Sequence, residues 1–263
     1  VGELTDRQGK VWDLHLKGSG PTPFSRRGDG HAALGPVLRE YLVSEAMAAL
    51  GIPTTRALAA LTTGENVVRE TLMPGGVVAR VASTHVRVGT FQFFAARQDR
   101  EGLTLLVDHV IERLYPELAD SPNRALALLN AVVDRQARLI AQWMLVGFIH
   151  GVMNTDNMSI AGETIDFGHC AFLDSYDPGK VFSFIDQNGR YAYGQQPDMA
   201  LWNLGRLAEA LLPGINADTD HAVSLATDTL SRFDSIFGET YLSGWRRKLG
   251  LFSEGRTDTT LIS

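Results

Sequence analysis

The residues most able to carry out chemistry lie within the stretch 150–168, HGVMNTDNMSIAGETIDFG. Asp156 and Asn157 are adjacent there, and a second carboxylate, Asp166, begins an Asp-Phe-Gly tripeptide. Metal-assisted phosphoryl transfer needs oxygen ligands for Mg²⁺ and a carboxylate that orients or deprotonates an attacking hydroxyl. Kinase-like active sites take these groups from a catalytic loop and from an Asp-Phe-Gly that follows a short strand. The spacing therefore predicts such a site, although Asp and Asn also form ordinary turns and the tripeptide arises by chance.

Flanking elements are expected to hold these groups in place. Residues 163–165 are typical of a short strand, and residues 154–159 form the loop before it. The helical pattern over residues 124–149 becomes almost wholly apolar toward its end, which predicts a buried helix beneath the loop. Further helical patterns cover about 103–114, 199–212 and 222–237.

A candidate lysine–glutamate pair precedes this region. Residues 11–17 alternate apolar and polar side chains, as a half-buried strand does, and Lys17 ends the run. Residues 34–50 show helical spacing, with Glu40 near the middle. In the kinase plan, a glutamate on the helix holds the strand lysine so that its ammonium group meets the nucleotide phosphates. Lys17 and Glu40 have that order, whereas each residue taken alone is typical of a solvated surface.

The remaining basic residues leave two interpretations open. Arg26 and Arg27 lie in a loop rich in Gly and Pro that could meet an anion, but it matches no phosphate-loop pattern, so a plain connection explains it equally well. Residues 54–80 form short extended runs that predict a meander of antiparallel strands, separated at Gly64 and at residues 74–76. Arg80 and Arg87 follow, suited to phosphate contacts, although two arginines at this spacing are more often surface groups.

The composition is that of an ordinary globular protein, with 44% hydrophobic and 21% charged residues. A formal net charge of −6 argues against a surface that coats nucleic acid. No run approaches the roughly 18 uncharged apolar residues that a membrane helix requires. We therefore expect neither nucleic acid nor a membrane as a partner. The single cysteine, Cys170, allows no internal disulfide and fits a reducing compartment.

The pattern changes from strand-rich to helical near residue 95. This predicts an α+β, protein-kinase-like fold of two lobes, with a small strand-rich N-lobe over residues 1–95 and a larger helical C-lobe over residues 96–263.

Longer runs of sequence resemble one known family. The segments LKGSGPTPFSRRGDG (16–30), SEAMAALGIPTTRAL (44–58), HGVMNTDNMS (150–159) and TIDFG (164–168) are similar in sequence and order to the selenoprotein O family. The resemblance implies a kinase-like fold that binds ATP in a flipped orientation with Mg²⁺ or Mn²⁺. It also implies transfer of AMP to Ser, Thr or Tyr hydroxyls of protein substrates. The expected compartment is the cytoplasm in bacteria or the mitochondrion in eukaryotes.

The resemblance also implies roles for individual residues. Asp156 falls on the position of the catalytic base, and Asn157 and Asp166 fall on the metal ligands. Arg80 and Arg87 would neutralise the triphosphate end of the flipped nucleotide. The positions that the resemblance assigns to the nucleotide site are Lys17, Asp29, Gly30, Glu40, Arg80, Arg87 and Asp166.

The chain also departs from the family pattern. The family's glycine-rich segment is expected just before residue 1, and the family extends further at its C-terminus, so we expect the chain to be a fragment. His169 and Cys170 replace a usual Pro-Phe after the Asp-Phe-Gly. Two alternatives to AMP transfer remain open: a conventional kinase that transfers the γ-phosphate, and a nucleotide-binding pseudokinase.

Overall fold

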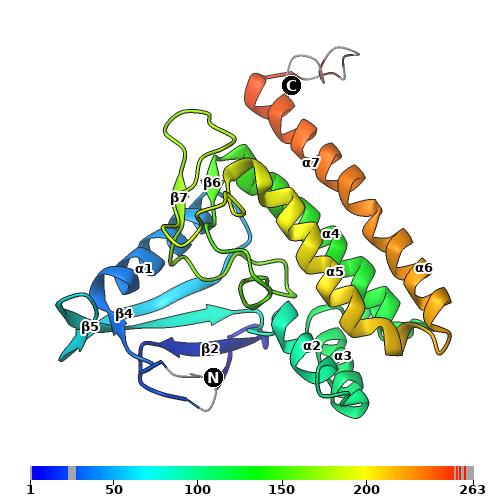
Figure 1. Cartoon of the computed structure of the whole chain (residues 1–263), viewed down its shortest axis with the longest axis horizontal. Helices are drawn as coiled ribbons and strands as arrows, with labels where there is room; N and C mark the ends of the chain where they lie inside the picture. Colours follow the sequence, from blue (N-terminus) through cyan, green and yellow to red (C-terminus); the bar gives the residue numbers. More distant parts are fainter. Residues whose placement is uncertain (1, 23–27, 252, 254, 256–257, 259–263) are drawn as a thin grey trace. The chain divides into compact units, whose positions relative to one another are not determined.

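The structure is a computed structural model of the 263-residue chain, and it describes residues 2–22, 28–251, 253, 255 and 258 (Figure 1). The chain divides into two compact units. The first contains Val1–His85 and Glu163–Gly168, and the second contains Val86–Gly162 and His169–Ser263. The division at residue 95 stays a prediction, because these units are defined by packing alone.

The first unit is built on a five-stranded antiparallel sheet with one helix. Strands β1, β2, β5 and β3 follow one another across the sheet, and β4 also pairs with β5. The α-helix α1 packs on β4 and β5. These elements span β1 Gly2–Thr5, β2 Val11–Lys17, β3 Ala32–Ala33, α1 Leu34–Ala49, β4 Arg56–Val68 and β5 Leu72–Ala82.

Both β2 and α1 match the predicted strand and helix closely, but the predicted meander is wrong at both of its separators. Residues 74–76 lie inside β5, and β4 and β5 are instead joined by residues 69–71. Gly64 lies inside β4 and does not end a strand. It has a φ of +78° and falls between Thr62 and Asn66, where the pairing of β4 with β5 shifts register. A glycine with positive φ accommodates such a bulge, so one long strand continues where two short ones were expected.

The segment Glu163–Gly168 belongs to the first unit through backbone bonds to residues 53–55. Thr164 donates its N–H to Pro53 O, and Thr55 donates its N–H to Thr164 O, each at 2.9 Å. The predicted strand at 163–165 is therefore reduced to a single parallel bridge between Thr54 and Thr164. Within Glu163–Gly168, no other residue pairs with a strand.

The second unit is helical and centres on α4, whose inward face is fully buried along most of its length. Helices α5 and α7 both pack on α4 (Figure 1). Its elements are α2 Val88–Ala95, α3 Arg100–Leu114, α4 Arg124–Leu145, β6 Phe148–Ile149, β7 Ala171–Phe172, α5 Gln196–Ile215, α6 Thr219–Leu230 and α7 Arg232–Leu249.

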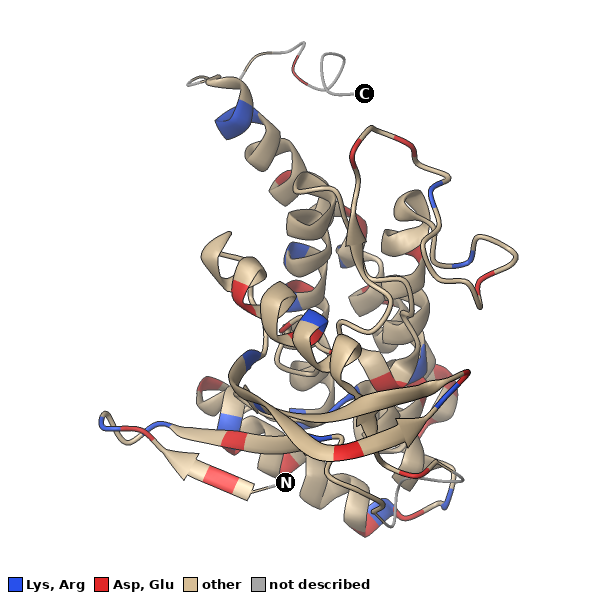
Figure 2. Cartoon of the chain, turned by 90° about the vertical axis from the view of Figure 1, so that its left-hand side faces the viewer, with Lys and Arg blue, Asp and Glu red and all other residues tan. Residues whose placement is uncertain are grey.

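Two helix boundaries differ from the sequence prediction. Helix α4 ends at Leu145, because Gly147 with a φ of +68° turns the chain out of the helix. The apolar end of the pattern is the short strand β6, which begins at Phe148. The pattern over 222–237 is split at Ser231 into α6 and α7. The last turn of α7 carries Arg246, Arg247 and Lys248, a blue band in Figure 2 that complements the negative end of the helix dipole.

The α+β class is confirmed, since an antiparallel sheet with one helix precedes a mainly helical unit, as in a kinase-like fold. Across the residues that the structure describes, no helix has both the length and the apolar character needed to span a membrane.

Candidate functional site

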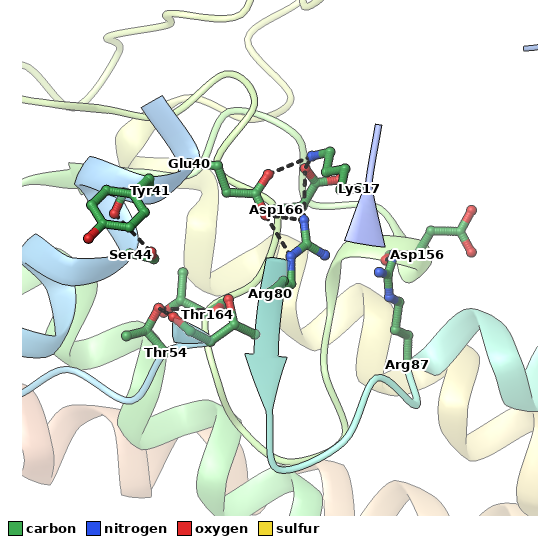
Figure 3. A network of polar contacts seen from close by, with 11 residues as sticks. Lys17, Glu40, Tyr41, Ser44, Thr54, Arg80, Arg87, Asp156, Thr164 and Asp166 are labelled. Carbon is green, nitrogen blue, oxygen red and sulfur yellow. Dashed lines mark hydrogen bonds and ion pairs between the residues drawn. The ribbon is translucent and has the colours of Figure 1, made fainter. Parts of the chain in front are cut away.

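Four predicted site residues meet within the first unit, where two cations face two carboxylates (Figure 3). Lys17 Nζ donates hydrogen bonds to Glu40 Oε2 at 2.7 Å and to Asp166 Oδ1 at 2.5 Å. Arg80 Nε donates to Glu40 Oε1 at 2.6 Å, and its Nη2 pairs with the same oxygen. Arg80 Nη2 also lies 3.9 Å from Asp166 Oδ1. Glu40 therefore holds one cation on each of its two oxygens.

The register of the sheet brings Lys17 and Arg80 to the same face. Lys17 lies opposite Val78 across the β2–β5 pair, and Arg80 follows Val78 by two residues. Directly paired residues and residues two apart share a face of a sheet, so the two cations are diagonal neighbours. Glu40 reaches them from α1, on the helix face that also buries Val37, Ser44 and Met47.

Burial makes this network costly to disrupt. Glu40 is 3% exposed and Arg80 is 2% exposed, and buried charges persist in proteins only when they are paired. By contrast, the side chains of Lys17 and Asp166 are 33% and 28% exposed. The network thus has a buried half, Glu40 with Arg80, and a half that solvent reaches, Lys17 with Asp166.

Asp166 has an unusual backbone and is fixed from both sides. Its φ is +67°, a left-handed conformation that non-glycine residues adopt rarely. Before it, the Glu163 carboxylate accepts hydrogen bonds from Ser83 N at 3.2 Å and from Ser83 Oγ at 2.5 Å. After it, Arg39 Nη1 donates to Gly168 O at 2.6 Å. Strained residues of this kind cluster at functional sites. The contacts from Ser83 and Arg39 were not predicted from the sequence.

Asp29 and Gly30 form a separate part of the first unit. Both carboxylate oxygens of Asp29 accept hydrogen bonds from Arg69, at 2.9 and 3.1 Å, and His31 N donates to Oδ1 at 3.0 Å. These donors lower the pKa of Asp29 from its usual value to about 2, with Arg69 the largest cause. Gly30 has a φ of +71°, and a Cβ there would overlap the carbonyl of Gly20. The neighbouring Arg26 and Arg27 lie outside the described residues.

The predicted catalytic loop lies in the second unit. Asp156 and Asn157 occupy a short 3₁₀ turn, Thr155–Asn157, where Asn154 Oδ1 accepts a hydrogen bond from Asp156 N at 3.0 Å. Asn157 Nδ2 donates to Val152 O at 2.9 Å. These local bonds explain the Asn-Thr-Asp-Asn sequence, since Asn side chains stabilise tight turns by bonding nearby backbone groups.

Arg87 contacts the backbone of this loop. Its Nη1 donates to Asp156 O at 2.7 Å, and its own backbone forms an antiparallel bridge with Ser159. Val88 N donates to Met158 O at 3.0 Å, which extends the contact into the first turn of α2. These contacts give Arg87 a structural role at the loop that was not predicted from the sequence.

Gly89, in the first turn of α2, is a further site residue that the sequence analysis missed. A Cβ at this position would overlap Oδ1 of the Asp156 side chain. The absence of a side chain lets the carboxylate of Asp156 lie against the N-terminal turn of the helix, whose partial positive charge favours an anion. Only the packing of α2 on the loop identifies Gly89, because nothing distinguishes it in the sequence.

Buried side chains of the surrounding helices hold the loop by its carbonyl groups. Gln136 Nε2 donates to Ser159 O at 2.6 Å, Tyr115 Oη to Ile160 O at 2.7 Å, and Asn203 Nδ2 to Met153 O at 2.9 Å. Burial strongly raises the pKa of Tyr115, so it remains a donor across the physiological range. A loop anchored in this way keeps its geometry, because each freed carbonyl would be a buried group without a partner.

Comparison with known proteins assigns the chain to a family. The sequence model of the family described as "Protein adenylyltransferase SelO" matches residues 1–262. Three similar relatives are proteins named "Protein nucleotidyltransferase YdiU". Those of Rhizobium rhizogenes and Rhodopseudomonas palustris (strain BisB18) are each 62% identical over 262 residues, all of this chain and 52% and 53% of their own lengths. That of Methylorubrum populi is 65% identical over 251 residues, 95% of this chain and 50% of its own.

The chain thus spans about half the length of the curated relatives that it matches. The match extends over the strand-rich and the helical unit alike, and the expectation drawn from the sequence runs is confirmed: the chain belongs to the SelO family.

Proposed function

We propose that the protein transfers AMP from ATP to Ser, Thr or Tyr hydroxyls of other proteins. Membership of a family described as a protein adenylyltransferase supports the reaction class. The observation that carries the proposal is the group of Lys17, Glu40, Arg80 and Asp166, which combines cations for phosphates with a carboxylate that solvent reaches. ATP bound in the flipped orientation would present its α-phosphate at the reacting position.

The proposed roles follow the chemistry of each side chain. Lys17 binds the phosphates as a point charge, and Glu40 orients it. Arg80 and Arg87 neutralise the triphosphate end, Arg80 from its buried pair with Glu40 and Arg87 beside the loop. Asp29 and Gly30 contribute a rigid turn to the nucleotide site.

The donor set suits Mg²⁺ or Mn²⁺. The amide of Asn157 donates through Nδ2, which leaves Oδ1 as an oxygen ligand, and the carboxylate of Asp166 is part-exposed. No cluster of three His, Cys, Asp or Glu side chains suited to a metal occurs in the described part of the chain. A nucleotide-bound Mg²⁺ needs only one or two protein carboxylates, because the phosphates and water supply the other oxygens. When bound, the ion would neutralise charge that develops on the phosphates.

In the proposed reaction, Asp156 accepts the proton of the attacking hydroxyl. The hydroxyl oxygen forms a bond to the α-phosphorus, and the bond between this phosphorus and the oxygen bridging to the β-phosphate breaks, so pyrophosphate leaves. The bond from Arg87 to the backbone carbonyl of Asp156 supports this role, because it fixes the loop that carries the carboxylate. The absence of a side chain at Gly89 leaves space for this carboxylate beside α2.

Labelled ATP tests the proposal. The protein and, in parallel, its relative from Rhizobium rhizogenes are incubated with a protein acceptor and with ATP labelled at either the α- or the γ-phosphate. We expect label on protein only from the α position, and its loss in Asp156→Ala. Label only from the γ position would instead identify a conventional kinase. ATP binding that survives Asp156→Ala, without labelling by the wild type, would identify a pseudokinase.

A further inference from the structure

A cavity of about 420 Å³ lies in the second unit, apart from every residue assigned to AMP transfer. It opens to solvent and is lined by residues of α3, of the segment 121–125 at the start of α4, and of the last turn of α5. Its volume falls within the roughly 300–1,000 Å³ typical of small-molecule sites.

Contacts between the ends of α4 and α5 fix the shape of the cavity. Asn123 joins the two helix ends, since its Nδ2 donates to Ile215 O at 2.9 Å and its Oδ1 accepts from Leu126 N at 3.1 Å. Gly214 lets these ends approach closely, because a Cβ there would lie 3.2 Å from the Cβ of Ala125. The cavity is therefore preformed, which lowers the entropic cost of binding a ligand.

One wall is apolar and belongs to the core. Leu103, Val107, Leu211 and Ile215 are between 0% and 6% exposed, and they come from two different helices. A ligand that covers this wall gains from burial of its own apolar surface. This wall therefore favours a ligand with a hydrocarbon or aromatic part.

The polar lining residues carry excess positive charge. Arg100 and Arg124 supply two guanidinium groups, and Asp108 is the one acidic residue that lines the cavity. Arg124 Nη1 pairs with Asp108 Oδ1 at 2.8 Å, but both side chains are partly exposed, at 38% and 40%, so the pair is weak. Within the described chain, the buried Nε of Arg124 has no hydrogen-bond acceptor, and Arg100 forms no ion pair.

The first turn of α4 also favours an anion in this cavity. It contains no acidic side chain, and Asn123 caps the amide of Leu126 but not those of Arg124 and Ala125. The first amides of a helix carry partial positive charge and favour an anion. The polar lining thus favours a single negative head group next to an apolar body.

We propose that this cavity binds an anionic amphiphile of small-molecule size. Its head group, a carboxylate or an anion of similar size, is bound by Arg124 and Arg100, and its apolar chain lies on Leu103, Val107, Leu211 and Ile215. This site is independent of the nucleotide site, so failure of the proposed transferase activity leaves it untouched.

Three probes with the same chain and different head groups test the proposal. Octanoate, 1-octanol and octylammonium are titrated into the 263-residue protein by isothermal calorimetry. We expect the affinity for octanoate to be at least about tenfold higher than that for octanol, because one charge-assisted hydrogen bond contributes that much. Octylammonium should bind most weakly. Equal affinities for octanoate and octanol would overturn the proposal.

Two variants with matched controls locate the site. Arg124→Gln should remove the preference for octanoate, whereas Arg138→Gln, an exposed arginine of the same helix paired with Asp134, should keep it. Thr104→Trp places a bulky ring in the cavity and should abolish binding, while Leu105→Trp, its exposed neighbour on α3 outside the cavity, should not. Octanoate binding unchanged in Thr104→Trp would overturn the proposal even if Arg124→Gln failed to fold.

Discussion

Asp166 Oδ1 accepts a hydrogen bond from Lys17 Nζ at 2.5 Å, so the proposed metal ligand and the proposed phosphate-binding lysine contact each other directly. The backbone of Asp166 is left-handed, with a φ of +67°, a conformation that costs on the order of 1–3 kcal/mol. The ion pair and the bond from Arg39 to Gly168 O help to maintain that conformation. The Asp166 carboxylate is therefore held in a fixed position by contacts within the first unit.

Replacing the two partners should have unequal effects on AMP transfer. Asp166→Ala removes the proposed metal ligand and should lower the initial rate about 10³-fold, because both positioning and charge neutralisation would be lost. Lys17→Ala removes one of several cations and should lower it less, by about tenfold. Incorporation of AMP from α-labelled ATP measures both rates. Full activity in both variants would contradict the assignment.

The Glu40–Arg80 pair should matter for stability. Arg80→Met leaves Glu40 as a buried carboxylate with one partner fewer, which should lower the free energy of unfolding by about 3–5 kcal/mol. Arg56→Met is the control, because Arg56 also pairs with a carboxylate of α1, Glu45, at 2.6 Å, but its side chain is 56% exposed. That exposed pair should contribute less than about 1 kcal/mol. Urea unfolding of both variants measures whether the loss in free energy of unfolding is larger for Arg80→Met than for Arg56→Met.

Gly89→Ala should impair catalysis without unfolding the protein. The added methyl group would overlap the Asp156 carboxylate and displace it, which we expect to lower the rate of transfer about 10²-fold. Gly205→Ala is the matched control, since Gly205 lies within α5 with open space at its Cβ position. It should keep full activity and gain up to about 1 kcal/mol of helix stability. Equal rates in the two variants would remove Gly89 from the site.

The carboxyl group of Asp29 should have a pKa well below that of an ordinary aspartate. Its hydrogen bonds to Arg69 and His31 N lower its pKa from 3.8 to about 2. Because the folded pKa lies below the unfolded one, the stabilisation by this group is complete above about pH 4 and is lost as the pH falls toward 2. The side-chain carbon resonance, followed by NMR against pH, should show this midpoint. In Arg69→Ala the midpoint should rise toward 3.8, and an unchanged midpoint would exclude Arg69 as the main cause.

The sequence by itself determined some of the local elements, such as β2 and α1, and the candidate residues. Alternation over residues 11–17 places Lys17 at a strand end, and helical spacing places Glu40 on α1, because side-chain period depends only on local backbone geometry. The Asp-Asn pair and the Asp-Phe-Gly can also be recognised from the sequence alone, because the signal is their spacing along the chain.

Only the tertiary structure decided which partners these residues take. Arg80 meets Glu40 because the register of β2 on β5 and the packing of α1 bring together residues 40 positions apart. The contacts of Arg87 and Gly89 with Asp156 arise from the packing of α2 against the loop. Such pairings depend on how distant elements pack, which no local periodicity encodes. The sequence therefore predicted the pair of Lys17 with Glu40, but not the pairs of Arg80 with Glu40 and of Lys17 with Asp166.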